Sequence, residues 1–420
     1  MVAEQITEHG LVDDPHLRRG ARGYPLLPGG YGRSTYYTGR PSPYAVRGEG
    51  YRVWDDRGRE HIDANNNFTS LIHGNAHPEI VEAAVRALSA GASWGIPNLD
   101  EWELAEQLMT RLPSLDQVRF TNSGTEAVMA AIRIARGSTG RDRVLVTDGG
   151  YHGTSDVALV PGGPSYTRGV PRGVIDDVTP IPLNDVSALH AAVEAAPAAY
   201  AAIILDLLPN RAGLLHITDE FVHSARELAS RHGIVLIIDE VISLRLGYHG
   251  ISGEYGIEPD LLTTGKTIGG GFPVGAVAGR GELMAEVDPT KPNSLPHGGT
   301  FSGNPVSMAA GAAALRLYPE SEVLRLNALG EIVRSSVSAR IAGTGWTVRG
   351  QGSLIRAVPE GVNKVDDATQ HRLWWESYER GLLGSPANLL SLSTPMDKAV
   401  AVDLADRLAD AVIAVSDKQD

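Results

Sequence analysis

The sequence DLLTTGKTIGGG, residues 260–271, places a single lysine, Lys266, between an apolar, strand-like run and a glycine-rich turn. A lysine ammonium is a poor nucleophile, but one that is partly desolvated at the end of a strand loses its proton more easily and can condense with an aldehyde. The stretch therefore makes Lys266 a candidate for Schiff-base chemistry. A solvated surface lysine in front of a loop is the alternative for this segment alone, because most lysines are exposed.

Short apolar runs alternate with helical patterns on both sides of this stretch, from about residue 60 to residue 300. The runs are hydrophobic at consecutive positions, which indicates strands covered by helices on both faces and hence a mostly parallel sheet. Helical patterns at 101–111 and 219–231 separate the strands at βαβ spacing. The sequence thus predicts an α/β fold. The expected strands include residues 144–146, 202–205, 234–238 and 274–278.

The character of the sequence changes after about residue 305. An alanine-rich helical run, 307–317, leads into a smaller α+β region that ends in the amphipathic stretch 397–413. The first 45 or so residues are rich in Gly, Pro, Arg and Tyr without a clear period, which is typical of an arm that packs on another surface. We expect an arm and part of a small domain at 1–60, a large domain at 61–305, and the rest of the small domain at 306–420.

The composition excludes several classes of function. The 420 residues carry a formal net charge of -13 at pH 7, and such a field repels nucleic acid and anionic membranes. With no cysteine, the chain has no disulfide, thiolate nucleophile or Cys-based metal site. His73 and His77 are four residues apart, but no carboxylate completes a zinc pattern, so we expect no metal site. Neither a secretory signal nor a membrane-spanning run is visible, and we expect a soluble, cytoplasmic protein.

A candidate phosphate site precedes a strong helical pattern. The sequence FTNSGTEA, residues 120–127, puts Ser123, Gly124 and Thr125 at the start of that helix. Backbone N–H groups at a helix N-terminus are unpaired and the helix dipole is positive there, which suits a bound phosphate. An ordinary Ser or Thr cap with Glu126 in the first turn also fits these residues.

Two other predicted strands end in polar or aromatic residues. Asp239 follows the run 234–238, at the end of a strand where doubly wound sheets bind ligands, and its carboxylate could pair with a cationic ring nitrogen. A helix cap or a magnesium ligand would explain Asp239 equally well. Tyr151 and His152 follow the run 144–146 and offer an aromatic face, although Tyr151 also fits simple packing at the rim.

Together these segments supply a lysine, a strand-end carboxylate, an aromatic platform and a phosphate cradle. Pyridoxal 5'-phosphate requires this combination: a lysine for the Schiff base, a partner for its pyridinium nitrogen, and an anchor for its phosphate. Each signal is weak by itself, and the set of four predicts this cofactor.

The same segments resemble the class III aminotransferases of the type I pyridoxal-phosphate fold, in particular glutamate-1-semialdehyde aminomutase and the β-amino-acid aminotransferases. The resemblance covers nearly the whole chain. It implies a large cofactor-binding domain, 61–305, with a mostly parallel sheet between helices, plus a smaller α+β domain. Its motifs are NSGTEA at 122–127, YHG at 151–153, DEV at 239–241, TGK at 264–266, GGG at 269–271 and GTFSGNP at 299–305.

The resemblance also implies roles for the residues around the cofactor ring. Lys266 would carry the cofactor as a Schiff base and shuttle a proton, and Asp239 would hold the pyridinium nitrogen. Tyr151 and Val241 would lie on the two faces of the ring, and His152 belongs to the same cofactor-binding motif.

For the phosphate, the resemblance implies Ser123, Gly124 and Thr125, together with Thr300 from a partner subunit. A homodimer is therefore implied as well, since the cofactor would be held by residues of two chains.

Two arginines are the candidates for substrate binding. Arg33 lies where β-amino-acid aminotransferases carry a carboxylate-binding arginine, and a guanidinium can hold a carboxylate through two hydrogen bonds. A surface arginine of the arm is the alternative. Asp206 and Leu207 replace the Glu-Pro pair of the family, and Arg211 follows where relatives carry Glu, Asn or a small residue. A second guanidinium near the substrate is one interpretation, and a loop residue is the other.

Two departures concern the reaction. Ala387 stands where some β-amino-acid enzymes place a further arginine, and the segment 160–166 is shorter than the gating loop of the aminomutase. A shorter loop favours release of a keto product. The sequence therefore predicts an aminotransferase with small-molecule amine and carbonyl substrates: a carboxylate-bearing donor, such as a β-amino acid, and a keto or aldehyde acceptor. An intramolecular aminomutase is the first alternative; another pyridoxal-phosphate reaction or a non-catalytic cofactor-binding protein are further ones.

Overall fold

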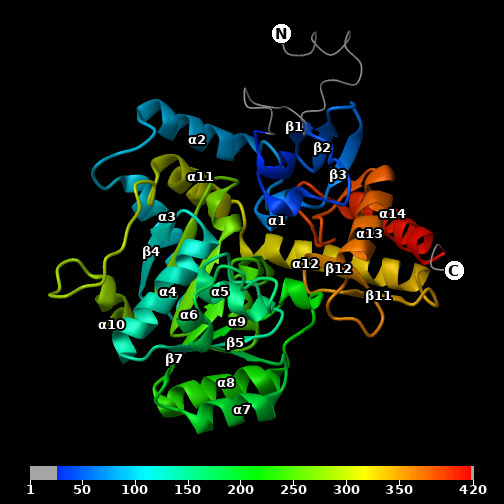
Figure 1. The fold of residues 1–420 in the computed structure, drawn as a ribbon. Coiled ribbons are helices and arrows are strands. Elements are labelled where there is room, and N and C mark those ends of the chain that lie inside the picture. The colour runs from blue at the N-terminus through cyan, green and yellow to red at the C-terminus, as the bar shows by residue number, and fades with distance from the viewer. Residues whose placement is uncertain (1–25, 418–420) are drawn as a thin grey trace.

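The computed structural model describes residues 26–417, so the first 25 residues of the predicted arm lie outside the described residues. A seven-stranded sheet forms the centre of the larger part of the molecule, in the order β4-β10-β9-β8-β7-β5-β6 (Figure 1). Its strands are β4 (Gln117–Thr121), β5 (Arg143–Thr147), β6 (Val178–Ile181), β7 (Tyr200–Leu205), β8 (Val235–Asp239), β9 (Leu261–Gly265) and β10 (Gly275–Gly279).

Helices cover both faces of this sheet, which explains why its strands are apolar at every position. Ile203 and Leu205 of β7 pack in one buried cluster with side chains of α7 and α8. Ile204, between them, points to the other face and packs with α4. The helices of this part are α2 (Pro78–Ala90), α3 (Leu99–Arg111), α4 (Gly124–Thr139), α5 (Asp156–Leu159), α6 (Arg172–Asp176), α7 (Val186–Ala195), α8 (Asp219–His232), α9 (Gly250–Glu254), α10 (Gly281–Met284) and α11 (Pro305–Arg316).

The predicted strand at 274–278 is present as β10, but its direction differs from that of the parallel strands. The strands β6, β5, β7, β8 and β9 pair in parallel, whereas β10 is antiparallel to both β9 and β4. The chain passes from β9 to β10 through the glycine-rich turn 266–274, without the long crossover that parallel pairing requires. The length of this connection therefore sets the strand direction, which apolar content alone does not reveal.

The smaller part of the molecule combines the two ends of the described chain. One sheet has the order β1-β2-β3-β13, in which β3 and β13 run parallel although they come from opposite ends of the sequence. The other has the order β11-β12-β14. The elements are β1 (Ala45–Glu49), β2 (Arg52–Asp55), β3 (Glu60–Asp63), α1 (Asn66–Thr69), α12 (Glu320–Arg340), β11 (Trp346–Arg349), β12 (Leu354–Pro359), α13 (Asp367–Glu379), β13 (Leu382–Leu383), β14 (Leu390–Ser391) and α14 (Lys398–Ser416).

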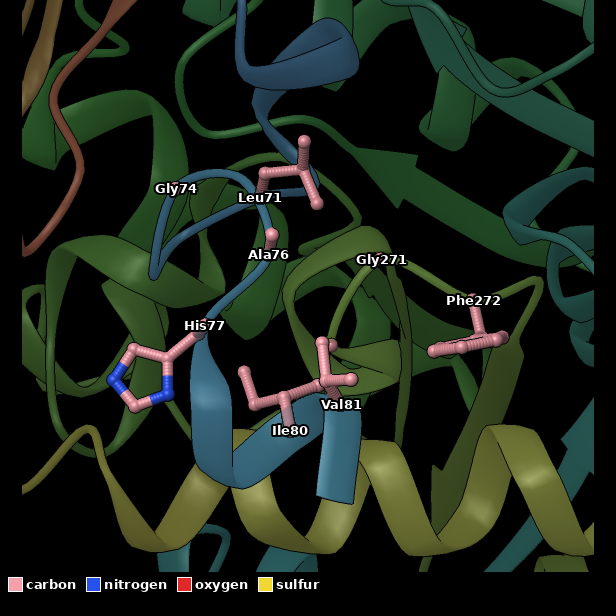
Figure 2. Close-up of a pocket in the computed structure, with 9 residues that line it drawn as sticks. Leu71, Gly74, Ala76, His77, Ile80, Val81, Gly271 and Phe272 are labelled. Atoms are coloured by element: carbon pink, nitrogen blue, oxygen red, sulfur yellow. The ribbon is translucent and has the colours of Figure 1, made fainter. Parts of the chain in front are cut away.

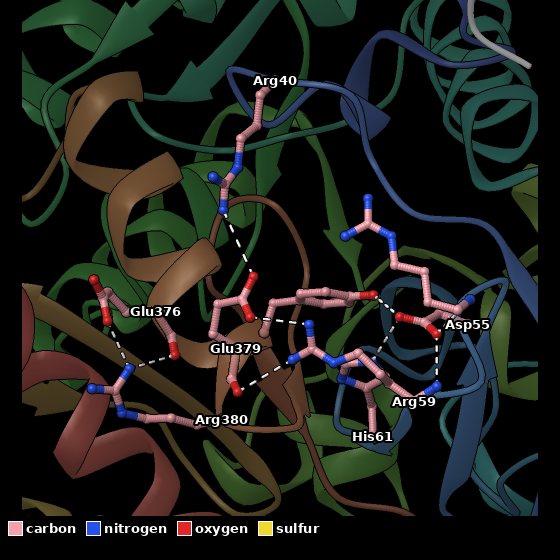
Figure 3. A network of polar contacts seen from close by, with 9 residues as sticks. Arg40, Asp55, Arg59, His61, Glu376, Glu379 and Arg380 are labelled. Atoms are coloured by element: carbon pink, nitrogen blue, oxygen red, sulfur yellow. Dashed lines mark hydrogen bonds and ion pairs between the residues drawn. The ribbon is translucent and has the colours of Figure 1, made fainter. Parts of the chain in front are cut away.

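Polar contacts fasten the N-terminal strands to α13 (Figure 3). The hydroxyl of Tyr378 donates to the buried carboxylate of Asp55, which also lies 3.4 Å from Nε2 of His61. Burial lowers the pKa of His61. Nearby, Nη1 of Arg59 donates to Glu379 at 3.0 Å. The N-terminal segment is thus held by residues more than 300 positions later in the chain.

The pairing of β3 with β13 joins the N-terminal segment to the C-terminal one, and the domains 1–60, 61–305 and 306–420 stay a prediction. The strand β3 and the helix α1, both in the smaller part, lie at and beyond the predicted boundary at residue 60. The helix α11 follows the second boundary, but it packs against α2 and α3 of the larger part. Across residues 26–417, no helix combines the length and the apolar character that a membrane span requires.

Candidate active site

The predicted cofactor residues gather at one edge of the large sheet. Asp239 is the last residue of β8, and Lys266 follows the last residue of β9. Tyr151 and His152 follow β5, and Ser123 follows β4 and caps α4. Because the carboxyl ends of parallel strands meet at the same edge, segments that are distant in sequence come together there.

Asp239 is the most firmly held charged group of this edge. Its side chain is 5% exposed, and Oδ2 lies 2.8 Å from Nδ1 of His152. Its other oxygen, Oδ1, accepts hydrogen bonds from the hydroxyl of Thr263 and the backbone N–H of Val241, each at 3.1 Å. Burial alone would lower the pKa of His152, but the hydrogen bond and the negative charge of Asp239 outweigh it, and the pKa is raised. The carboxylate is therefore fixed in position before any ligand binds.

Lys266 occupies a strained and poorly solvated position. Its backbone φ is +50°, a left-handed conformation that is uncommon for a residue other than glycine. Desolvation lowers the pKa of Lys266 to about 8, although the charges of Asp239 and Asp206 oppose that shift. Burial, reinforced by the charge of Asp239, raises the pKa of Asp206 to about 7. Of residues 26–417, none forms an ion pair with Lys266, so a free amine is accessible near neutral pH.

The N-terminus of α4 shows the helix cap and leaves donors for the phosphate site that the sequence predicts. Oγ of Ser123 accepts a hydrogen bond from the backbone N–H of Glu126 at 3.2 Å, which is a helix cap. The serine hydroxyl hydrogen and the first backbone N–H groups of the helix are still available as donors for an anion. The cap and the phosphate site are therefore compatible.

Close packing ties this helix end to the other turns. A Cβ on Gly153 would lie 2.4 Å from Oγ1 of Thr125, and a Cβ on Gly124 would lie 2.8 Å from the side chain of Val241. Only glycine permits these approaches. The structure thus brings together Ser123, Gly124, Thr125, His152, Val241, Asp239 and Lys266, all of which the sequence predicted.

On the neighbouring turn, Arg211 lies between two tyrosine rings. Its guanidinium carbon is 4.4 Å from the ring centre of Tyr151 and 4.3 Å from that of Tyr166. Its positive charge also acts on His152, where it opposes the rise in pKa. The structure therefore places Arg211 beside the cofactor residues. Tyr166 was not predicted as a site residue, although it ends the quoted segment 160–166.

Arg33 lies on an exposed part of the N-terminal segment. Its Nη1 donates to Oδ1 of Asn67 at 3.3 Å, and its guanidinium lies over the rings of Tyr36 and Phe68, at 4.9 and 6.0 Å. Asn66, Asn67, Phe68 and Thr69 have φ values of 47°, 46°, 56° and 76°, so four consecutive residues are left-handed. Asparagine tolerates this conformation better than most residues. The run of asparagines at 65–67 is the sequence feature that indicates this turn.

Thr300 lies in an exposed turn between β10 and α11, and no described contact of its own chain joins it to Lys266. A small, largely apolar pocket flanks the glycine turn that follows Lys266 (Figure 2). It contains none of the predicted site residues. Its lining includes Leu71, Gly74, Ala76, His77, Ile80, Val81, Gly271 and Phe272.

Comparison with known proteins gives the family. Residues 38–393 match the family described as aminotransferase class-III. The chain belongs to the class III aminotransferases. Enzymes of this family depend on pyridoxal 5'-phosphate, and a similar solved structure, 38% identical, is a transaminase with this cofactor bound. The predicted family, enzyme class, cofactor and type I fold are therefore confirmed.

Individual relatives of this class III aminotransferase carry different names. A glutamate-1-semialdehyde 2,1-aminomutase of Rhodopirellula baltica is 36% identical, with 85% of this chain and 86% of the relative covered. Among solved structures, an omega-transaminase from Sphaerobacter thermophilus is 41% identical with a TM-score of 0.88, covering 93% of this chain and 95% of that one. A β-phenylalanine aminotransferase from Variovorax paradoxus is 32% identical with a TM-score of 0.83, covering 93% and 90%.

Proposed function

We propose that this enzyme transfers an amino group from a carboxylate-bearing donor, with β-amino acids as the first class to test, to a keto or aldehyde acceptor. The observation that supports this most directly is the presence of two guanidinium groups, Arg33 and Arg211, for which the described residues provide no carboxylate partner. Arginine binds carboxylates through its planar set of donors, and stacking on aromatic rings leaves the edge of that plane free.

The proposed roles of the cofactor residues are those that the family resemblance implies, and the positions of these residues support them. When bound, pyridoxal phosphate supplies an electron sink for the carbon that loses its proton. Lys266 would hold the cofactor aldehyde covalently and afterwards, as a neutral amine, move a proton at the substrate carbon. Asp239, oriented by His152 and Thr263, would keep a negative charge beside the ring nitrogen. Tyr151 and Val241 would lie against the ring.

For the phosphate we propose Ser123, Gly124 and Thr125 of one protomer and Thr300 of the partner subunit. Support for a homodimer comes from a group of exposed apolar side chains along α2, the following loop and α3, which a second copy would cover. They are Val81, Val85, Leu88, Trp94, Ile96, Leu99 and Trp102. The cytoplasmic location stays a prediction from the sequence.

An intramolecular aminomutase is the second candidate function, because the relative from Rhodopirellula baltica carries that activity in its name. Such an enzyme would need no separate acceptor. The short segment 160–166, which ends at Tyr166 over Arg211, supports the transferase instead, since it leaves less chain to enclose an intermediate.

The test is a spectral titration of the cofactor-loaded enzyme with single α-amino acids, β-amino acids and terminal amines, without an acceptor. Conversion of the lysine-bound cofactor to its amino form by β-amino acids, with a keto product in solution, supports the proposal. Conversion by terminal amines alone would argue against a carboxylate-bearing donor. If glutamate-1-semialdehyde rearranges without an acceptor and no donor converts the cofactor, the aminomutase assignment replaces the aminotransferase assignment.

A further inference from the structure

Arg356, in the middle of β12, is a buried charge that the proposed function does not use. Its side chain is 3% exposed, and no carboxylate among residues 26–417 pairs with it. Burial lowers its pKa to about 10, and the positive charge of Arg349 adds to that shift. Arg349 is its direct neighbour across the β11–β12 pair, where like charges repel. Burying an unpaired guanidinium is costly, so some other interaction must account for this residue.

The contacts of Arg356 converge on one residue of another segment. Its Nη1 donates to the backbone carbonyl of Asn210 and, at 3.1 Å, to the side-chain Oδ1 of the same residue. Its Nη2 lies 3.5 Å from Oε1 of Gln370 in α13. Arg356 thus binds both the main chain and the side chain of Asn210, and the contact with α13 helps to orient its guanidinium. We call the two hydrogen bonds to Asn210 the grip on this residue.

Asn210 directly precedes Arg211 in the turn that leaves β7. The turn is closed by the hydrogen bond from the N–H of Leu214 to the carbonyl of Pro209, at 3.1 Å. Its neighbour Gly149 approaches so closely that a Cβ there would lie 2.7 Å from Cβ of Ala212. These contacts fix where the turn lies, and the grip on Asn210 fixes the orientation of the peptide from which Arg211 extends.

We propose that Arg356 is a positioning residue that, through Asn210, presets Arg211 to bind a carboxylate of the substrate beyond the one assigned to Arg33. The substrate class that follows is a dicarboxylate, as amino donor or as acceptor. This inference rests on the proposed function for the role of Arg211. A preset guanidinium saves the entropy of ordering a long side chain at the moment of binding, and the saving appears as affinity for the anion.

A purely structural role makes a different prediction. A buried charged residue can often be replaced by an apolar residue of similar volume with little change in stability. If Arg356 only fills space, Arg356→Met should leave anion binding unchanged, or should weaken cofactor and anion binding together through a general loosening of the fold.

The probe is glutarate, a dicarboxylate without an amino or keto group, used as an inhibitor of the amine half-reaction in the cofactor-loaded enzyme. For Arg356→Met and for Arg211→Met we expect the inhibition constant of glutarate to rise about tenfold. A rise of this size corresponds to the loss of the charged hydrogen bonds from one guanidinium to a carboxylate. Cofactor affinity and thermal midpoint should change little in both. The double variant should bind glutarate no more weakly than Arg211→Met does, because the two residues act as one unit.

Arg349→Met is the matched control, since Arg349 is adjacent on the sheet and lies against Gly213 of the same turn, but its hydrogen bond goes to Asn363 and not to Asn210. It should leave the glutarate constant unchanged. Arg356→Lys should restore part of the affinity, because an ammonium can still donate to the carbonyl of Asn210. If Arg356→Met does not fold, Asn210→Ala, which removes only the side-chain half of the grip, should give a smaller rise.

Three outcomes would overturn the inference. If the inhibition constant of glutarate rises in Arg211→Met but not in Arg356→Met, Arg211 remains an anion site and Arg356 has no role in positioning it. A parallel loss of cofactor affinity in Arg356→Met would assign it to the fold alone. Failure of glutarate to inhibit the wild-type enzyme would dismiss the dicarboxylate, while the spectral titration would still decide the aminotransferase assignment independently.

Discussion

Asp239 and Arg33 are both charged residues that the sequence assigned to the site, yet the structure holds them in opposite ways. Asp239 is 5% exposed and has three hydrogen-bond partners, from β9, from the turn after β8 and from the turn after β5. Arg33 is exposed and has one amide contact and two aromatic rings nearby. The residue proposed for the cofactor is therefore built into the core, whereas the residue proposed for the substrate lies on an exposed loop; we call these the cofactor side and the substrate side.

This difference assigns separate tasks to the two sides. A buried carboxylate and a desolvated lysine need a rigid environment, because their charge states depend on it. Recognition of a substrate can be changed by altering exposed loop residues without disturbing that environment. Relatives with the names aminomutase, omega-transaminase and β-phenylalanine aminotransferase fit such a division, since they share this fold.

The largest expected effect lies on the cofactor side, at Lys266. In Lys266→Ala, proton transfer at the substrate carbon loses its base, and the rate of the amine half-reaction should fall by at least about 10²-fold. In the cofactor-free enzyme the thermal midpoint should not fall, because the substitution removes a desolvated charge. Single-turnover spectra with excess donor provide the measurement. A rate within tenfold of wild type would show that another group carries the proton.

Asp239→Asn should have the next largest effect, a fall in kcat/KM of about 10²-fold, because a neutral amide no longer places a negative charge beside the ring nitrogen of the cofactor. The raised pKa of His152 should fall as well, because the hydrogen bond to Asp239 and the charge of that carboxylate cause the rise. Steady-state kinetics and NMR titration of the His152 ring measure the two effects. An unchanged histidine pKa would contradict the electrostatic account.

The lowered pKa of Lys266 predicts a pH dependence that is specific to the cofactor side. The neutral amine reacts with the cofactor aldehyde, so uptake by the cofactor-free enzyme should slow about tenfold for each pH unit below 8 and level off above it. The same shift makes the unfolded chain bind more protons between pH 8 and about 10.5, so the contribution of Lys266 to stability should rise with pH across that window. Stopped-flow absorbance follows the uptake, and a plateau that begins near pH 10 would refute the shift.

The substrate side should respond in affinity instead of rate. Arg33→Ala should raise KM for a carboxylate-bearing donor about tenfold, with kcat nearly unchanged, through loss of a charged hydrogen-bond pair. Asn67→Ala should give a smaller rise of about threefold, because it only frees the Arg33 guanidinium from one contact at 3.3 Å. A terminal amine is the control donor, and its KM should not change. A fall in kcat for both donors would erase the distinction between the two sides.

The sequence was a good guide where a site residue stands at the end of an apolar strand. Asp239, Lys266 and Ser123 are each fixed by the few residues before them, and their meeting follows from the geometry of a parallel sheet. The direction of β10 was not predictable from its apolar residues, since the length of the preceding turn decides it.

Contacts between distant segments were not predictable. The stacking of Tyr166 on Arg211 and the grip of Arg356 on Asn210 join segments whose approach no local pattern specifies. A charged residue within the buried strand LIRAVP, residues 354–359, was a visible irregularity, but its partner depends on the packing of β12 beside the turn after β7. The four left-handed residues 66–69 likewise depend on contacts of Asn66 with Ser391, far along the chain.

The pairing of β3 with β13 has a consequence for how the chain is assembled during synthesis. Arg59 and Glu379, on either side of that junction, are 320 positions apart. The strands that surround Lys266 are complete once the ribosome has passed β10. The strands β1, β2 and β3 can pair with one another early, whereas β3 must wait for nearly the whole polypeptide before it can pair with β13. The segment that presents Arg33 is therefore translated first and secured last, so that truncation near the C-terminus deprives the enzyme of an element encoded at its beginning.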